Sequence, residues 1–135
     1  MRKIRILFNG IPSSGKTTYA QKLHLALEHV GYETVLLDDE VIKRLDTIKV
    51  NNLVEYLGAP ITIIASTDAC IEADVKIWCD IGIREAEKRN RRKLDEENAP
   101  RLGSYDVWDG YQGQGIKVKN WEDVCREVNK TSLSF

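Results

Sequence analysis

Short apolar runs alternate with longer amphipathic stretches along the whole chain. The first of these runs is short and mostly apolar, as in a strand that is buried in a parallel sheet. The first run ends at Asn9-Gly10, a typical turn signal. The predicted strands are Ile4–Phe8, Thr34–Leu37, Pro60–Ala65, Val75–Cys79 and Ile116–Val118.

Between Lys16 and Val30 the apolar residues recur at helical spacing on one face, and Gly31 provides a stop signal. Shorter patterns predict four more helices, at Val41–Leu45, Asn52–Leu57, Ile83–Asp95 and Trp121–Val128. Strands and helices that alternate in this way predict a three-layer α/β fold with a mostly parallel sheet of about five strands. The length of 135 residues suits a single domain, 1–135.

Composition narrows the range of partners. Lys and Arg (20) nearly balance Asp and Glu (21), and the formal net charge of −1 does not favour nucleic acid or an anionic membrane surface. No apolar run approaches the ~20 residues of a membrane span. The three cysteines, Cys70, Cys79 and Cys125, have no spacing typical of zinc or redox sites. We therefore expect a cytoplasmic protein with reduced thiols.

One motif carries chemistry directly. Residues 10–17 match G-x-x-x-x-G-K-[ST] at every fixed position, and the match follows a predicted strand and opens a predicted helix. This is the context of a P-loop, whose backbone amides bind phosphate oxygens. The predicted nucleotide-binding residues are Gly10, Ile11, Pro12, Ser13, Ser14, Gly15, Lys16, Thr17 and Thr18.

Within this P-loop NTPase fold, the Lys16 side chain is expected to reach the β- and γ-phosphates of ATP, and the Thr17 hydroxyl to bind Mg²⁺. The motif does not identify the reaction. A guanine-specific GTPase needs Asn-Lys-x-Asp, and 129–132 lacks the Asp; the residues after Ala65 match a motor ATPase poorly. Small size and the acidic residues after the second strand favour a kinase.

Those acidic residues are Asp38 and Asp39, which follow the strand that ends at Leu37. In this fold they lie beside the P-loop, where a carboxylate can orient or deprotonate an acceptor hydroxyl. Asp38 is also a candidate for holding magnesium through water. The alternative is that both simply favour the start of the following helix through its dipole.

A dense basic cluster occupies the predicted helix over residues 83–95. Lid arginines of kinases neutralise charge on the transferred phosphoryl group, and Arg89 and Arg92 are the candidates for this role. The alternative is a solvated helix with ion pairs at i,i+4 spacing. A lid-like segment is expected at about 84–115, and its part from Gly103 to Gly115 either closes over substrate or packs on the core.

The P-loop followed by Leu37–Arg44 resembles the adenylylsulfate kinase family, in which Asp38 matches an aspartate of the motif after the second strand. Asp80 also falls where that family has an aspartate, and Arg89 matches its lid arginine. The resemblance implies transfer of the γ-phosphoryl of MgATP to an acceptor hydroxyl, with adenylylsulfate as one candidate. The region before Ile61 is shorter than in the family, so polynucleotide or nucleoside kinases and a non-catalytic nucleotide-binding module remain alternatives.

Overall fold

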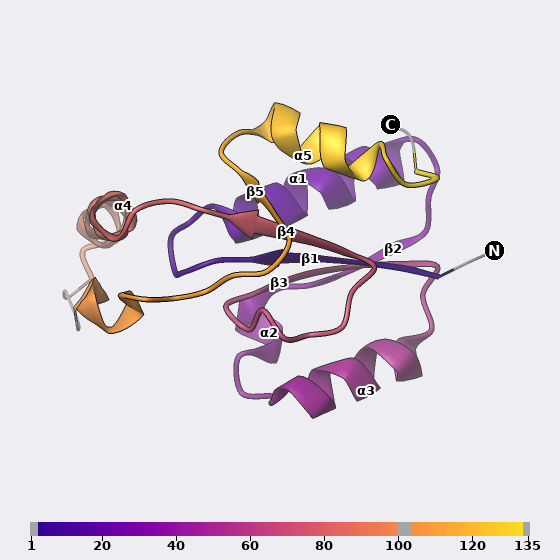
Figure 1. The fold of residues 1–135 in the computed structure, drawn as a ribbon, viewed down its shortest axis with the longest axis horizontal. Helices are drawn as coiled ribbons and strands as arrows, with labels where there is room; N and C mark the ends of the chain where they lie inside the picture. Colours follow the sequence, from indigo (N-terminus) through magenta and orange to yellow (C-terminus); the bar gives the residue numbers. More distant parts are fainter. Residues whose placement is uncertain (1–2, 100–103, 134–135) are drawn as a thin grey trace.

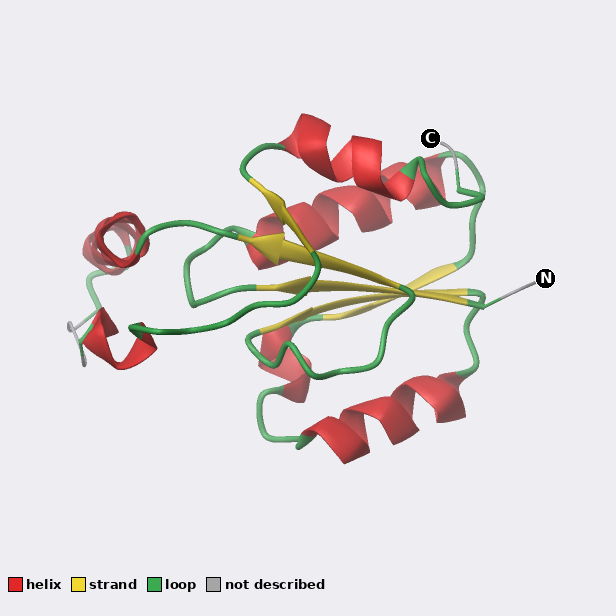
Figure 2. Cartoon of the chain, in the orientation of Figure 1, coloured by secondary structure: helices red, strands yellow, loops and turns green. Residues whose placement is uncertain are grey.

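The computed structural model describes residues 3–99 and 104–133. A parallel five-stranded sheet lies between two helical layers (Figure 1). Figure 2 shows the loops that connect the strands to the helices. The strands are β1 (Ile4–Asn9), β2 (Thr34–Leu37), β3 (Ile61–Ser66), β4 (Val75–Cys79) and β5 (Ile116–Val118).

The helices divide into three groups. Helices α1 and α5 cover one face of the sheet, α2 and α3 the other, and α4 lies beyond the carboxyl ends of the strands with the 3₁₀ turn η1 (Figure 1). The helical elements are α1 (Lys16–His29), α2 (Asp39–Ile42), α3 (Thr47–Leu57), α4 (Ile83–Glu96), η1 (Tyr105–Trp108) and α5 (Trp121–Val128).

The strand order is β2-β3-β1-β4-β5, and every neighbouring pair is parallel. The chain leaves the central strand β1 toward β2, on the β3 side, whereas it leaves the neighbouring β4 toward β5 on the opposite side, so a switch point lies between β1 and β4. Ligands of open parallel sheets bind at such a switch point. The segment after β1 therefore begins where a site is expected.

Strand β1 is buried on both faces, which explains its continuous apolar run. Ile6 and Phe8 belong to the cluster beneath α1 and α5, whereas Leu7 belongs to the cluster beneath α2 and α3. All three side chains are fully buried. The predicted fold class is confirmed, because five parallel strands and helices on both faces are present.

Two helices begin earlier than the apolar pattern predicts. Helix α2 starts at Asp39 rather than Val41, because the Asp38 carboxylate caps it by accepting a hydrogen bond from the Glu40 amide. Helix α3 starts at Thr47 rather than Asn52, and its cap is the Asp46 carboxylate. Helices α1 and α5 match the predicted ranges closely.

The segment predicted as either a lid or a core-packing loop packs against the sheet over its final part. The Tyr111 hydroxyl donates to the Thr67 carbonyl at 2.6 Å, and the Gly113 backbone lies directly on the Trp78 ring, leaving no room for a Cβ atom. Residues 100–103 of the predicted 84–115 segment, Gly103 included, lie outside the described residues.

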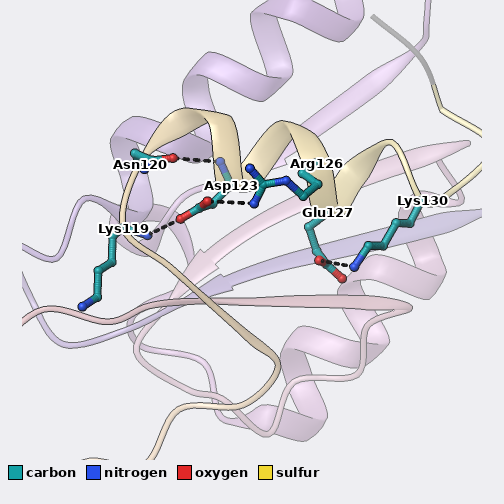
Figure 3. Close-up of polar contacts among 6 residues, drawn as sticks. All are labelled: Lys119, Asn120, Asp123, Arg126, Glu127 and Lys130. Carbon is teal, nitrogen blue, oxygen red and sulfur yellow. Dashed lines mark hydrogen bonds and ion pairs between the residues drawn. The ribbon is translucent and has the colours of Figure 1, made fainter.

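Helix α5 is fixed by polar contacts at its start, which Figure 3 shows, and by buried apolar side chains. The Asn120 side chain caps it at the Asp123 amide, and Asp123 in turn accepts from the Lys119 amide. Val124 and Val128 are buried in the core. Among the described residues, no helix is both long and apolar enough to cross a membrane.

Candidate functional site

The loop between β1 and α1 is folded tightly at its first glycine. A Cβ atom at Gly10 would lie 2.6 Å from the Ser14 Oγ and 2.8 Å from the Cys79 carbonyl oxygen. Gly15 has a φ of 96°, a left-handed conformation that side chains disfavour. The motif glycines are therefore required by close packing at Gly10 and by backbone conformation at Gly15.

The start of α1 leaves backbone donors available. Gly15 precedes the helix without any side-chain capping hydrogen bond, and the first turn carries no acidic residue. The amides of the first turn have no partner within a helix. The Ser14 hydroxyl is buried and has no hydrogen-bond partner among the described groups. Amide donors and a helix dipole at one place form an anion site.

Lys16 extends this site with a charge that is nearly enclosed by protein. Lys16 is 5% exposed, and its Nζ lies 3.8 Å from Oδ2 of Asp39. Burial lowers the pKa of Lys16, and the nearby carboxylate of Asp39 only partly opposes this shift. Burial likewise raises the pKa of Asp39 despite the attraction of Lys16. Both groups therefore hold their charges at a cost in the folded state.

Asp38 and Asp39 have different surroundings. One oxygen of Asp38 accepts from the Glu40 amide at 3.0 Å, so this residue does serve as a helix cap. Asp39 faces Lys16 instead. Both residues also line the cavity above the P-loop. Asp38 therefore caps α2 and at the same time lines the cavity.

The cavity has a volume of about 640 Å³, within the ~300–1,000 Å³ usual for ligand sites. Its walls come from the P-loop and α1, from the turn between β2 and α2, and from α4 with η1. The lining residues are Pro12, Ser13, Gly15, Lys16, Thr17, Thr18, Asp38, Asp39, Glu40, Arg89, Asn90, Lys93 and Tyr105.

Most of the residues predicted for the site meet in this cavity. Gly10, Ile11 and Ser14 belong to the same loop without lining it, and Arg92 is not among the described lining residues. Lys93 lines the cavity on the same face of α4 as Arg89, four residues earlier. The sequence pattern did not single out Lys93, Asn90 or Tyr105. For Lys93 the signal was available, because i and i+4 share a helix face.

Two side chains from the lid-like segment reach the P-loop itself. A terminal nitrogen of Arg89 lies 3.8 Å from the position that a Cβ of Gly15 would occupy. The Tyr105 and Ser13 hydroxyl oxygens are 2.9 Å apart and share a hydrogen bond. The cavity is therefore bridged by contacts between η1, α4 and the loop.

Among the described residues, no group of three or more His, Cys, Asp or Glu side chains is arranged to hold a metal ion. Mg²⁺ at nucleotide sites usually relies on substrate phosphates and only one or two protein ligands. Thr17 and Asp38 both line the cavity and suit that mode. Asp68, after β3, instead accepts from Thr47 and the Cys70 amide.

Comparisons with known proteins agree on the fold. Residues 5–55 match the family model described as chromatin associated protein KTI12. The solved structure of Chaetomium thermophilum Kti12 in complex with ADP-AlF3 is similar at 16% identity, covering 93% of this chain and 96% of that one, with a TM-score of 0.66. The solved structure of APE1195 is similar at 18% identity, covering 90% and 87%, with a TM-score of 0.63. No curated protein matches.

These similarities support a P-loop kinase-like fold and do not point specifically to adenylylsulfate kinases. The matched residues 5–55 run from β1 into α3 and include the P-loop and the acidic turn. The similarity to the family model therefore covers the part of the chain that supplies two of the three cavity walls.

Proposed function

We propose that this chain binds a nucleoside triphosphate, with ATP as the preferred form, together with Mg²⁺ in the cavity above the P-loop. The observation that carries the proposal is the uncapped start of α1 beside the enclosed Lys16 charge. Phosphate oxygens would accept from the loop amides and offset the cost of burying Lys16. The similar Kti12 structure is a complex with ADP-AlF3, which supports the same type of ligand.

Thr17 and Asp38 would hold the magnesium ion, directly or through water. The ion supplies charge neutralisation on the phosphates when it is bound. Arg89 and Lys93 would contribute positive charge from α4 on the opposite wall, with Arg92 as a further candidate. We expect cations on both walls to position the terminal phosphate between them.

The proposed reaction is phosphoryl transfer to an acceptor hydroxyl. The hydroxyl oxygen forms a bond to the γ-phosphorus, the bond from that phosphorus to the β–γ bridging oxygen breaks, and the nucleoside diphosphate leaves. The proton of the hydroxyl passes to Asp39 or Asp38. Asp39 suits this role because burial raises its pKa and therefore its affinity for the proton. Adenylylsulfate is one candidate acceptor.

A second candidate is a nucleotide-binding module that performs no transfer. Two observations favour it: the Asp38 carboxylate is engaged as a helix cap, and the matched family model is described as a chromatin-associated protein rather than as a kinase. Under this alternative the nucleotide would control contacts with another macromolecule. The location of the protein in the cell then follows from that partner, and a cytoplasmic location stays a prediction.

The test combines nucleotide binding with acceptor-dependent turnover. Calorimetry should show MgATP binding that Lys16→Ala weakens at least tenfold, about 1.4 kcal/mol. Lys22→Ala is the matched control, since Lys22 lies on the same helix outside the cavity, above the Trp121 ring. ADP release is then measured with adenylylsulfate, nucleosides, nucleoside monophosphates and 5′-hydroxyl oligonucleotides.

Release that one acceptor class stimulates, and that Lys16→Ala abolishes, establishes the kinase. Binding of MgATP without stimulation by any acceptor favours the nucleotide-binding module. If wild type and Lys16→Ala bind MgATP equally, or neither binds it, the P-loop proposal is wrong.

A further inference from the structure

A second, smaller cavity of about 160 Å³ lies at the carboxyl end of β4. The P-loop and η1 separate it from the larger one. Ile11 lines the small cavity and its neighbour Pro12 the large one, while Trp108 lines the small cavity and Tyr105 the large one. Since side chains at i and i+3 of a 3₁₀ helix are aligned, Tyr105 and Trp108 lie along one edge of η1. The two cavities are therefore adjacent.

Three aromatic rings line the small cavity: Trp78, Trp108 and Tyr111. We call these three residues together with Asp80 the aromatic pocket. The Tyr111 ring lies edge-on to both others, with centroids 6.4 Å from Trp78 and 5.9 Å from Trp108. These are favourable aromatic geometries. The hydrogen bond from Tyr111 to Thr67 fixes the middle ring, so the aromatic walls are pre-ordered.

The faces of the three rings are not equally free. Trp78 is covered by the Gly113 backbone, and the Lys117 Nζ lies 4.7 Å from its ring centroid. Trp108 comes from η1 and is only partly buried. Trp108 and Tyr111 are therefore the rings that can contact a ligand, whereas Trp78 supports them.

One carboxylate in this cavity can orient a ligand by accepting hydrogen bonds from it. Asp80 lines it, and the single ion pair found for Asp80 among the described residues is with Lys117, at 3.7 Å. A carboxylate accepts several hydrogen bonds, so Asp80 retains capacity for N–H donors. An aromatic wall with an adjacent acceptor suits a planar ring that carries N–H groups.

The volume limits the size of the occupant. At ~30 Å³ for each water, 160 Å³ holds roughly five waters. This is well below the ~300 Å³ at which whole drug-sized ligands are usually accommodated. The cavity therefore fits one ring system, and the remainder of such a ligand would extend past η1 into the larger cavity.

We propose that the aromatic pocket binds the nitrogen heterocycle of a nucleoside acceptor, whose sugar hydroxyl enters the larger cavity beside Asp39. The proposal rests on the phosphoryl transfer proposed above and names its acceptor class. Base–aromatic contact occurs at Trp108 and Tyr111, and Asp80 accepts from the base. Adenylylsulfate and free nucleosides both carry such a ring.

The tryptophans provide the readout. Trp121 lies away from the pocket, stacked on Tyr19. In the variant Trp121→Phe, Trp78 and Trp108 are therefore the tryptophans that remain to fluoresce. The Trp121→Phe variant is titrated with adenosine, guanosine, cytidine and uridine in the presence of saturating ADP. At least one nucleoside should quench the tryptophan fluorescence in a saturable way. Because ADP fills the donor site, a nucleoside bound there instead would give no signal of this kind.

Trp108→Leu should weaken nucleoside binding roughly tenfold, in line with the cost of losing one base–aromatic contact. Binding to this variant is measured by calorimetry, because the substitution removes one of the reporting tryptophans. Asp80→Asn should weaken binding of the same nucleoside. Val107→Ala is the matched control, since Val107 lies on the same turn, is 78% exposed and does not line the cavity. Circular dichroism checks that each variant is folded.

Repeating the titration in Lys16→Ala without ADP separates this proposal from the P-loop proposal. Nucleoside binding that survives Lys16→Ala and is lost in Trp108→Leu supports the aromatic pocket, whatever happens to ATP. The proposal is overturned if no nucleoside binds, or if binding is the same in Trp108→Leu and Val107→Ala. Quenching only by peptides with apolar side chains would overturn it too and indicate a protein partner.

Discussion

At the scale of single residues, the pair formed by Lys16 and Asp39 combines a functional arrangement with a cost in stability. The pKa of Lys16 is lowered and that of Asp39 is raised, so that both shifts favour the neutral form of the group. Burial outweighs the attraction between the two charges, which lie 3.8 Å apart. A buried pair of this kind is weak evidence for stabilisation. The arrangement is better explained by the phosphate that we propose as the third member of the group.

The pair predicts a specific dependence of stability on pH. The folded pKa of Asp39 is raised above its ordinary 3.8, so its contribution to stability is fully present below that pH and is lost as pH rises through the folded pKa. Asp39→Asn removes this loss. We expect the free energy of unfolding of the variant minus that of the nucleotide-free wild type to increase between about pH 3.5 and pH 7 in urea titrations.

A matched control for this experiment is Glu40→Gln, since Glu40 is an exposed neighbour in the same turn that pairs with Lys43. For Glu40→Gln the difference in unfolding free energy from wild type should change little over the same pH range. A difference for Asp39→Asn that shrinks with rising pH would show that attraction to Lys16 outweighs burial.

At the scale of elements, α4 buries very little for a helix of 14 residues. Ala86 is its one fully buried described side chain, whereas β1 has five buried positions out of six. An ion pair from Arg84 to Asp106 joins α4 to η1, and one from Arg89 to Glu85 lies within α4. Exposed ion pairs of this kind contribute little to stability. Local opening of α4 should therefore cost much less than opening of the sheet.

Hydrogen exchange tests this difference. Amides of α4 should exchange at least a hundredfold faster than those of β1 and β3, which corresponds to about 2.7 kcal/mol in opening free energy. MgATP should slow exchange in α4, because Arg89 and Lys93 would then contact phosphates. Amides of α5 serve as the internal control, and equal protection of α4 and β1 without nucleotide would contradict the prediction.

The elements also show which features of the fold and the site can be predicted from sequence. Apolar patterns located all five strands. For β1 and β3 the run is nearly continuous because strands buried on both faces need no alternation. Helix α3 was recognised only in its second half, because Thr47, Ile48 and Val50 are β-branched and its start depends on a cap at Asp46. Capping is a local polar contact that periodicity does not register.

The site was predictable as far as its parts are contiguous. The P-loop is a single run of residues, and the acidic pair follows a strand directly. Tyr105 was missed because its place depends on how η1 lies over the loop, which no local pattern fixes, whereas Lys93 could have been inferred from its position four residues after Arg89 on the same helix face. The contact between Ser13 and Tyr105 joins residues 92 positions apart, and the aromatic pocket likewise brings together separate stretches of chain.

At the scale of the whole molecule, one buried amide connects the centre of the sheet to the segment before β5. Asn9 is fully buried; its Nδ2 donates to the Ile77 and Gln114 carbonyls, and its Oδ1 accepts from the Gln114 amide. These bonds tie β1 to residues 105 positions away. Removing the side chain would break all three bonds, of which the one to Ile77 is buried and the two to Gln114 are partly buried.

Asn9→Ala should therefore lower the free energy of unfolding by about 2–4 kcal/mol, measured by urea denaturation. Asn51→Ala is the comparison, because Asn51 accepts one bond from the Glu72 amide at a position closer to solvent. Its loss should cost at most about 1 kcal/mol. Equal effects of the two substitutions would mean that the Asn9 contacts do not hold the sheet and its last segment together.

The order of the strands also has a consequence for synthesis on the ribosome. Strands β1 and β2 come first along the chain, yet they are not neighbours, because β3 lies between them and pairs with both. At ~5–20 residues per second, the interval between Asn9 and Ser66 takes roughly 3–11 s to translate. During that time the central strand of the protein has no pairing partner, which makes the nascent chain a natural client for chaperones that bind exposed apolar segments.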